Sequence, residues 1–286
     1  MSGMNHMVDY NFLMGWSPFL LLVLIGIVVL YLFATGERGR LSRFSGMGPV
    51  SRLKKFLFLF GIFLFFIAKG SPLNIWGHYL FLIHMLQQSI IYLAVPPLIL
   101  AGLPTRMVDS ILVGIGPLRM VWKISTKPII AIMAFNVLFS FYHVPFIFDA
   151  IMSSTLWMNL SIVILLPMAF FMWWPVISPN LEVNSMKPLH KVGYIFGMGM
   201  LLTPACALII FSEGILYQTY LNVPRVLGIS LLDDQQSGGI IMKILQEVIY
   251  GTALAWIFFQ WTRDERKKTE QEDKIRLERI RDMHNP

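Results

Sequence analysis

The sequence predicts an all-α fold: a polytopic membrane protein that forms a seven-transmembrane helix bundle, with its N-terminus outside and its C-terminus in the cytoplasm. The composition supports a membrane location, because 56% of the residues are hydrophobic, 14% are charged and the mean hydropathy is +0.65. Soluble domains are less apolar and more charged. Apolar runs recur at lengths near the 20 or so residues that cross a bilayer as a helix. Between these runs, basic residues fill alternate connections.

The apolar runs define the spans in order along the chain. We expect them at residues 17–34, 56–71, 78–104, 128–148, 156–177, 192–211 and 239–261. A basic, amphipathic connector at 105–127 separates the third span from the fourth. The last segment carries many charges of both signs, with Glu four residues before Lys or Arg, which favours a solvated helix. The expected division is a transmembrane domain over 1–262 and a helical cytoplasmic tail over 263–286.

The orientation follows from the basic residues. Of the 23 Lys and Arg residues, 20 lie in the connections 38–55, 105–127 and 178–191 or in the C-terminal tail. Lys69, Arg225 and Lys243 lie toward the opposite side. Cytoplasmic loops are enriched in Lys and Arg, so this asymmetry places the C-terminus inside. The same argument explains the net charge of +7 by topology, and no nucleic-acid partner is expected.

Several classes of protein are not indicated. The single cysteine, Cys206, excludes an intrachain disulfide and a C-x-x-C motif. No G-x-S-x-G, Walker or H-E-x-x-H pattern occurs, so no enzyme is expected. The first 16 residues contain no Lys or Arg, which favours a retained first helix over a cleaved signal peptide.

Three histidines fall in the outer half of the predicted bundle. His78 lies at the external end of the third span, His84 lies about 9 Å deeper at 1.5 Å per residue, and His143 lies near the external end of the fourth span. An ionisable residue inside a membrane segment is a functional-site hypothesis. Imidazole together with the abundant thioethers suits copper. We therefore predict a copper site of His84 and His143, with His78 at its rim.

Simpler interpretations stay open beside this one. Most methionines fill gaps in helix packing, and a membrane histidine often bonds to a neighbouring helix. Gln87 and Gln88 either bond across helices or orient the imidazole of His84. The tandem Pro96–Pro97 predicts a kink.

The start of the seventh span carries further candidates. Asp233 and Asp234 fit acids at a helix start. Asp149, Asp234 and Gln235 are expected to line the entrance of the site, with Met242 nearby on the outer side. Glu247 is a carboxylate within the bilayer, and the expected partner is Lys243 at the i, i+4 spacing.

Several of these stretches together resemble the multi-span CtaG family of cytochrome c oxidase assembly factors, known with caa3-type oxidases. The matching residues are His84, Met85, Gln87, Pro96, Pro97, Gly102, Pro104, Tyr142, His143, Pro145, Asp149, Trp173, Trp174, Pro175, Asp234, Gln235, Gln236, Gly239 and Met242. At two places the sequence departs from the family pattern, which weakens the prediction of a copper site built from many histidines. Gln88 stands where many members carry a second histidine, and Trp157, Met158 and Asn159 stand where others have histidines.

The resemblance implies a bacterial plasma-membrane protein that aids oxidase maturation, with copper delivery from the outer face as the expected role. Oxidase subunits and the lipid bilayer are the expected partners, and an external copper chaperone is a further candidate. Three alternatives remain: a metal-free scaffold for an oxidase subunit, a haem-binding membrane protein, and a transporter that uses Glu247.

Overall fold

The computed structural model is all-helical and describes residues 15–36, 50–104, 107, 116, 118–177, 186–225 and 228–284. The longer helices are α1 (Pro18–Thr35), α2 (Arg52–Gly70), α8 (Pro128–Tyr142), α10 (Thr155–Ile177), α11 (Pro188–Ile210) and α12 (Leu231–His284). The shorter elements are α3 (Leu73–Tyr79), α4 (Phe81–Ser89), the π-helical turn Ile90–Ala94, α5 (Val95–Gly102), α7 (Leu118–Ser125), α9 (Pro145–Met152) and the 3₁₀ turn Gln218–Tyr220.

The chain is a multi-pass membrane protein. Within the described residues, five helical segments are long and apolar enough to cross a membrane: 18–35, 81–102, 155–177, 188–210 and 231–277. Two bent pairs, α2 with α3 and α7 with α8, raise the number to seven if each pair is one span. These candidates lie in the same order and regions as the seven predicted spans.

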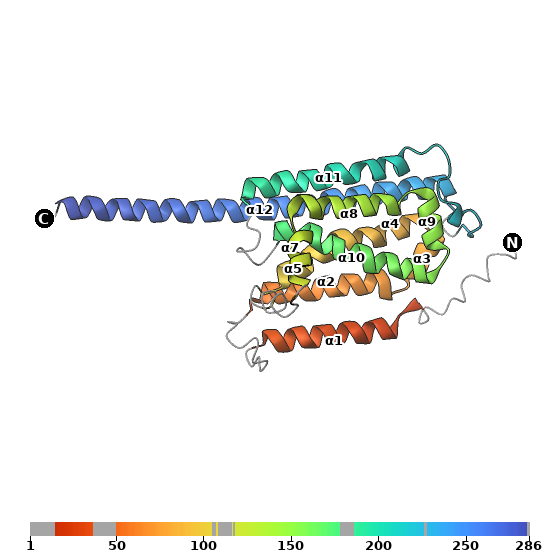
Figure 1. Ribbon diagram of the computed structural model, residues 1–286, viewed down its shortest axis with the longest axis horizontal. Helices are drawn as coiled ribbons and strands as arrows, with labels where there is room; N and C mark the ends of the chain where they lie inside the picture. The colour runs from red at the N-terminus through yellow and green to blue at the C-terminus, as the bar shows by residue number, and fades with distance from the viewer. Residues whose placement is uncertain are drawn as a thin grey trace.

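The helices run alongside one another, with α1 at the edge of the bundle (Figure 1). Helix α12 packs against α11 and α4, α2 packs against α5, and α10 packs against α8. The beginnings of α1 and α12 lie at one end of the bundle, and the last part of α12 projects from the other end (Figure 1). We call the end where α12 begins the distal end.

The predicted third span is divided. Leu80 is extended, with φ −128° and ψ 121°, and it separates α3 from α4, so His78 belongs to a separate short helix. The predicted kink appears as the π turn Ile90–Ala94, closed by a hydrogen bond from Val95 N to the carbonyl of Ile90. The turn precedes the tandem proline, which lacks the N–H groups that continue a regular α-helix.

The predicted fourth span also ends early. Helix α8 stops at Tyr142, and α9 begins at Pro145. A residue before proline avoids the helical region, and Val144 is accordingly extended with φ −66° and ψ 125°. Asp149 therefore lies on a second short helix rather than near the end of a long one.

The last helix is longer than predicted. It begins at Leu231 instead of Gly239 and runs without interruption to His284, through the segment expected to form a helical tail. Asp233 and Asp234 lie in its first turn, as predicted. The side chains of residues 263–277 are all exposed.

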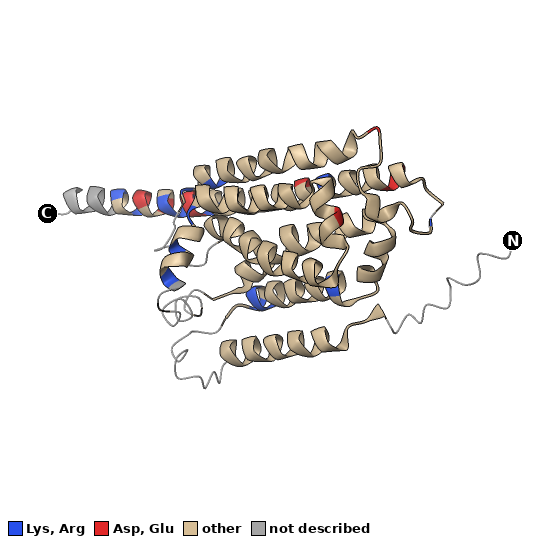
Figure 2. Ribbon diagram, turned by 45° about the vertical axis from the view of Figure 1, so that its right-hand side comes forward, with Lys and Arg blue, Asp and Glu red and all other residues tan. Residues whose placement is uncertain are grey.

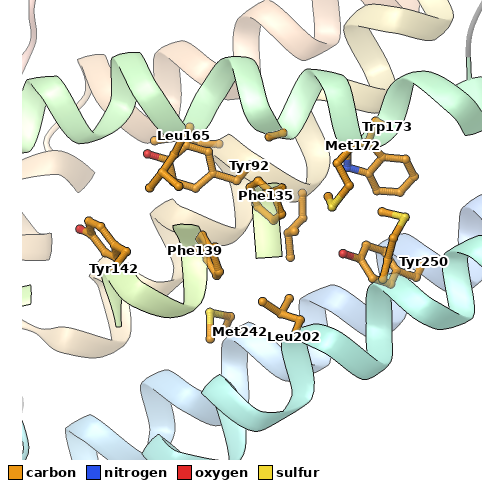
Figure 3. Close-up of a cluster of buried hydrophobic side chains, with 14 of the residues drawn as sticks. Tyr92, Phe135, Phe139, Tyr142, Leu165, Met172, Trp173, Leu202, Met242 and Tyr250 are labelled. Carbon is orange, nitrogen blue, oxygen red and sulfur yellow. The ribbon is translucent and has the colours of Figure 1, made fainter. Parts of the chain in front are cut away.

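The interior is filled by aromatic and methionine side chains. Tyr92, Phe135, Phe139 and Trp173 are fully buried and belong to one cluster that joins α8, α10, α11 and α12 (Figure 3). Met242, predicted beside the metal site, lies inside this cluster and is 0% exposed. Its position makes it a packing residue.

The charges are divided between the two ends. Within the described bundle, the Lys and Arg residues at the start of α2, in α7 and at the start of α11 lie at the end where the charged part of α12 emerges (Figure 2). The acidic residues of α9, of the segment between α11 and α12 and of the first turn of α12 lie toward the distal end (Figure 2). The predicted asymmetry between alternate connections is thus present in space.

Gly102 allows α1, α2 and α5 to meet. A Cβ atom at Gly102 would lie 2.6 Å from the backbone nitrogen of Phe58 and 2.7 Å from the carbonyl oxygen of Lys54. The carbonyl of Gly102 accepts a hydrogen bond of 2.8 Å from the hydroxyl of Tyr31. The ring of Tyr31 stacks on Phe58 with centroids 3.8 Å apart. This small residue therefore sets the separation of α2 from α5 and anchors α1 to both.

We expect Gly102→Ala to destabilise the folded protein by about 1–3 kcal/mol, because the new methyl group overpacks against backbone atoms that cannot rotate away. Thermal unfolding of the purified protein in detergent measures the effect. Gly26→Ala in α1 is the matched control, since a Cβ atom at Gly26 would meet no other atom within 4 Å. Equal midpoints for the two variants would contradict the close approach at Gly102.

Candidate functional site

A small polar cavity of about 30 Å³ lies between α2, α3, α4, α8 and α10. Its size is enough for a water molecule or a small ion. The residues that line it are Lys69, Asn74, His78, His84, Gln87, Gln88, Ile91, Tyr142, Met158, Ser161 and Ile162. We call it the histidine cavity.

His84 is the most constrained of these residues. It is 8% exposed, and its Nε2 atom lies 2.9 Å from the hydroxyl of Tyr142 on α8 and 3.2 Å from Nε2 of Gln88. The amide nitrogen of Gln88 can only donate, so Nε2 of His84 carries a lone pair in this arrangement. The edge of its ring meets Phe148, with centroids 5.3 Å apart.

The two glutamines have different partners. Gln87 donates from Nε2 to the carbonyl oxygen of Ala68 and so joins α4 to α2. Gln88 contacts His84 and, at 3.4 Å, the hydroxyl of Tyr142, while its Oε1 atom is buried without a partner in the described part of the chain. Both residues line the histidine cavity.

The break at Leu80 explains how His78 reaches the same cavity as His84. In an unbroken helix, six residues rotate the side-chain direction by about 240° around the axis, so the two side chains point to different faces. Because α3 and α4 are separate helices, both imidazoles line one space. The thioether of Met158, from α10, lines it as well.

His143 is not among the residues that line the cavity. It is 1% exposed, and Nδ1 donates to the carbonyl of Phe139 at 2.7 Å. Its Nε2 atom is buried and has no hydrogen-bond partner in the described ranges. Across those ranges, no group of three or more His, Cys, Asp and Glu side chains is placed to hold a metal ion. The three imidazoles therefore do not form the expected cluster.

Asp234 does not line the cavity entrance. Its side chain is 0% exposed, and its two oxygens accept hydrogen bonds of 3.0 Å from the backbone N–H groups of Phe81 and Leu82. These are N–H groups of the first turn of α4, which have no partner within the helix. Arg225 balances the charge, with its NH1 atom 3.4 Å from Oδ2 of Asp234. Asp234 therefore caps α4 from another helix.

Asp149 has an equivalent role toward the loop that precedes α12. It accepts hydrogen bonds from the backbone N–H groups of Gln218 and Thr219, at 3.1 and 3.0 Å, and from the hydroxyl of Thr219. The neighbouring Tyr217 and Tyr220 donate to the carbonyls of His143 and Gly77. Burial raises the pKa of both phenols above the ordinary value, so both stay protonated donors.

Gln235 also fixes this loop instead of lining the cavity. Its Nε2 atom donates to Ser212 and Gly214, and its Oε1 atom accepts from the backbone N–H of Leu216 at 2.8 Å. Gln236 adds a bond to the carbonyl of Ser212. The predicted entrance residues therefore do not line the cavity: Asp234 caps α4, whereas Asp149 and Gln235 bind the backbone of the segment between α11 and α12.

The predicted pairing of Lys243 with Glu247 is confirmed. Their charged atoms lie 2.7 Å apart, and the side chain of Glu247 is 63% exposed. Lys243 also contacts the hydroxyl of Thr203. Glu247 therefore faces outward on α12 and does not enter the histidine cavity.

Three of the cavity residues are not identifiable as site residues from the sequence. In the sequence, Lys69 is interpreted as a charge that marks membrane topology, and Met158 as a packing residue. Tyr142 is noted only because it matches the family resemblance. No spacing signal connects them, because they come from α2, α10 and α8 and meet only in the folded bundle. A polar residue inside an apolar run is the one available indicator.

We expect Asp234→Asn to lower stability by about 1–2 kcal/mol, since the amide leaves one N–H of α4 unsatisfied and Arg225 unpaired. Thermal unfolding in detergent measures the change, and Asp233→Asn is the control because, among the described residues, the side chain of Asp233 is hydrogen-bonded to Ser230 alone. If the two variants unfold together, Asp234 does not hold α4.

Most of the sequence is similar to a family of known proteins. A family model described as "Cytochrome c oxidase caa3 assembly factor (Caa3_CtaG)" matches residues 29–264. No curated protein and no solved structure matches the chain. The family is one of assembly factors, which implies a non-catalytic role. The match covers the second to the seventh predicted spans and the last part of the first, and the chain therefore belongs to the caa3-type cytochrome c oxidase assembly factor family.

Proposed function

We propose that the protein assists the maturation of a caa3-type cytochrome c oxidase in the bacterial plasma membrane by holding Cu(I) transiently and passing it to an oxidase subunit. Copper is a cargo in this proposal. The observation that carries it is the meeting of two imidazoles and one thioether, His78, His84 and Met158, at one cavity. Such a donor set suits the cuprous ion.

The distribution of charge supports an outward-facing site. The cavity is lined by the last turn of α2 and by α3, which lie toward the distal end, whereas the Lys and Arg residues at the start of α2, in α7 and at the start of α11 lie at the other end (Figure 2). A cytoplasmic location of that basic end places the cavity in the outer half of the bilayer. Copper then enters from outside, directly or from an external copper chaperone.

The hydrogen bonds of His84 suit a transient cargo. Its Nε2 lone pair already faces the amide of Gln88 and the hydroxyl of Tyr142. A cuprous ion at Nε2 must displace these contacts, and each is worth about 1 kcal/mol net. The competition lowers the affinity and favours release. His143 is not assigned as a ligand, because it does not line the cavity.

We expect His84→Ala to lower Cu(I) affinity roughly 10-fold or more, since even outer-shell partners of metal ligands commonly change affinity by that factor. Competition with a chromogenic chelator measures affinity, and oxidase activity at matched expression measures maturation. His190→Ala is the control, because His190 is exposed at the opposite end. Wild-type protein that binds no Cu(I) would exclude the copper proposal.

A metal-free scaffold is the second candidate, favoured by the bonds that join α4 to α8 through His84 and Tyr142 and α4 to α2 through Gln87. Polar contacts of this kind hold membrane helices together. His84→Gln separates the two functions: an amide can preserve the hydrogen bond but is a poor ligand for Cu(I). Normal oxidase maturation in this variant supports the scaffold, and loss of maturation with unchanged stability supports copper.

A further inference from the structure

We infer that the histidine cavity binds a small monovalent anion of the halide class, held by the ammonium of Lys69 with the amide of Asn74 and the imidazole of His78. The inference goes beyond the proposed function, because it rests on charge and hydrogen-bond donors and needs no copper.

Lys69 places a positive charge at the cavity. It lies in the last turn of α2, is partly buried and lines the cavity. Within the described residues, its ammonium makes no ion pair and no hydrogen bond. The end of α2 supplies only a partial negative charge from free carbonyl groups. A charged group at membrane depth normally pairs with another group or with water in a cavity.

None of the described carboxylates forms an ion pair with Lys69. Asp234 pairs with Arg225 and caps α4, Glu247 pairs with Lys243, and Asp149 accepts from the loop at Gln218 and Thr219. No carboxylate is among the residues that line the cavity. The positive charge therefore faces a space bordered only by neutral polar and apolar groups.

The other cavity groups are arranged as donors. The side chains of Asn74 and His78 have no hydrogen-bond partner within the described ranges, and both line the cavity beside Lys69. An ammonium, an amide and an imidazole all present N–H groups. Gln87 also lines the cavity, but its amide nitrogen already donates to the carbonyl of Ala68. Three unused donor groups around one space are a binding arrangement for an anion.

The size of the cavity limits the ligand. About 30 Å³ accommodates a particle close to a water molecule, which includes a halide and excludes a phosphate group or a larger organic acid. A monovalent anion of this size neutralises the ammonium without adding a net charge to the bundle. We therefore choose chloride as the probe and bromide as its heavier equivalent.

The test follows thermal unfolding of the full-length, copper-free protein in detergent with a Cu(I) chelator present. Chloride replaces gluconate at constant ionic strength, so general screening stays unchanged. We expect the unfolding midpoint to rise by a few °C and to saturate, because a ligand that binds only the folded state stabilises it by mass action. Sulfate should give no saturating rise, because it exceeds the cavity.

Lys69→Met should abolish the chloride-dependent rise, whereas Lys187→Met, which removes an exposed charge at the opposite end, should retain it. If Lys69→Met does not fold, Asn74→Leu replaces it and should reduce the rise at least by half.

Crystals grown with bromide should show an anomalous peak between Lys69 and His78. A wild-type protein without a saturating halide effect, or an equal rise in Lys69→Met, overturns the inference. Since copper is absent throughout, failure of the copper proposal leaves this result unaffected.

Discussion

The carboxylate of Asp234 is the contact on which the distal end of the bundle depends. Breaking a membrane helix at Leu80 frees backbone N–H groups where no water is available, and each unsatisfied group costs several kcal/mol in hydrocarbon. Asp234 accepts from two of them, and Arg225 offsets its charge while also reaching the carbonyls of Tyr79 and Tyr220. The break can therefore exist, and it is the break that turns His78 and His84 toward one cavity.

The spans could be predicted from composition, because hydrocarbon selects apolar runs of a fixed length whatever the tertiary structure. The breaks are harder to predict. Pro145 is a local signal for a helix break, since the residue before a proline avoids the helical region. The apolar run nevertheless continues past it. Leu80 has no such signal, because Asp234, which caps the helix after the break, lies 153 residues from Phe81 in the chain. The short-range interpretation of Asp234 as a helix-start acid is correct and still incomplete.

The candidate site could also be predicted only in part. His84 stands out because a polar residue in an apolar run requires an explanation, and Gln88 shares its face at the i, i+4 spacing. Met158 and Lys69 look ordinary in sequence, where methionine fills cores and a lysine marks a helix end. Only the folded bundle places them beside His84. For His143 the ring direction depends on the bond to Phe139, which sequence spacing does not determine in a helix that ends at Tyr142.

The charge of Lys69 affects how tightly the cavity can bind a cation. The donors His78, His84 and Met158 are neutral, so a cuprous ion beside the ammonium places two positive charges in one small space. Two unit charges about 5 Å apart repel by about 3 kcal/mol at an effective dielectric of 20, which is roughly a hundredfold in affinity. Because a space of about 30 Å³ holds one particle close to the size of a water molecule, metal and anion would compete for the cavity, and the anion would balance Lys69 only while no copper is bound.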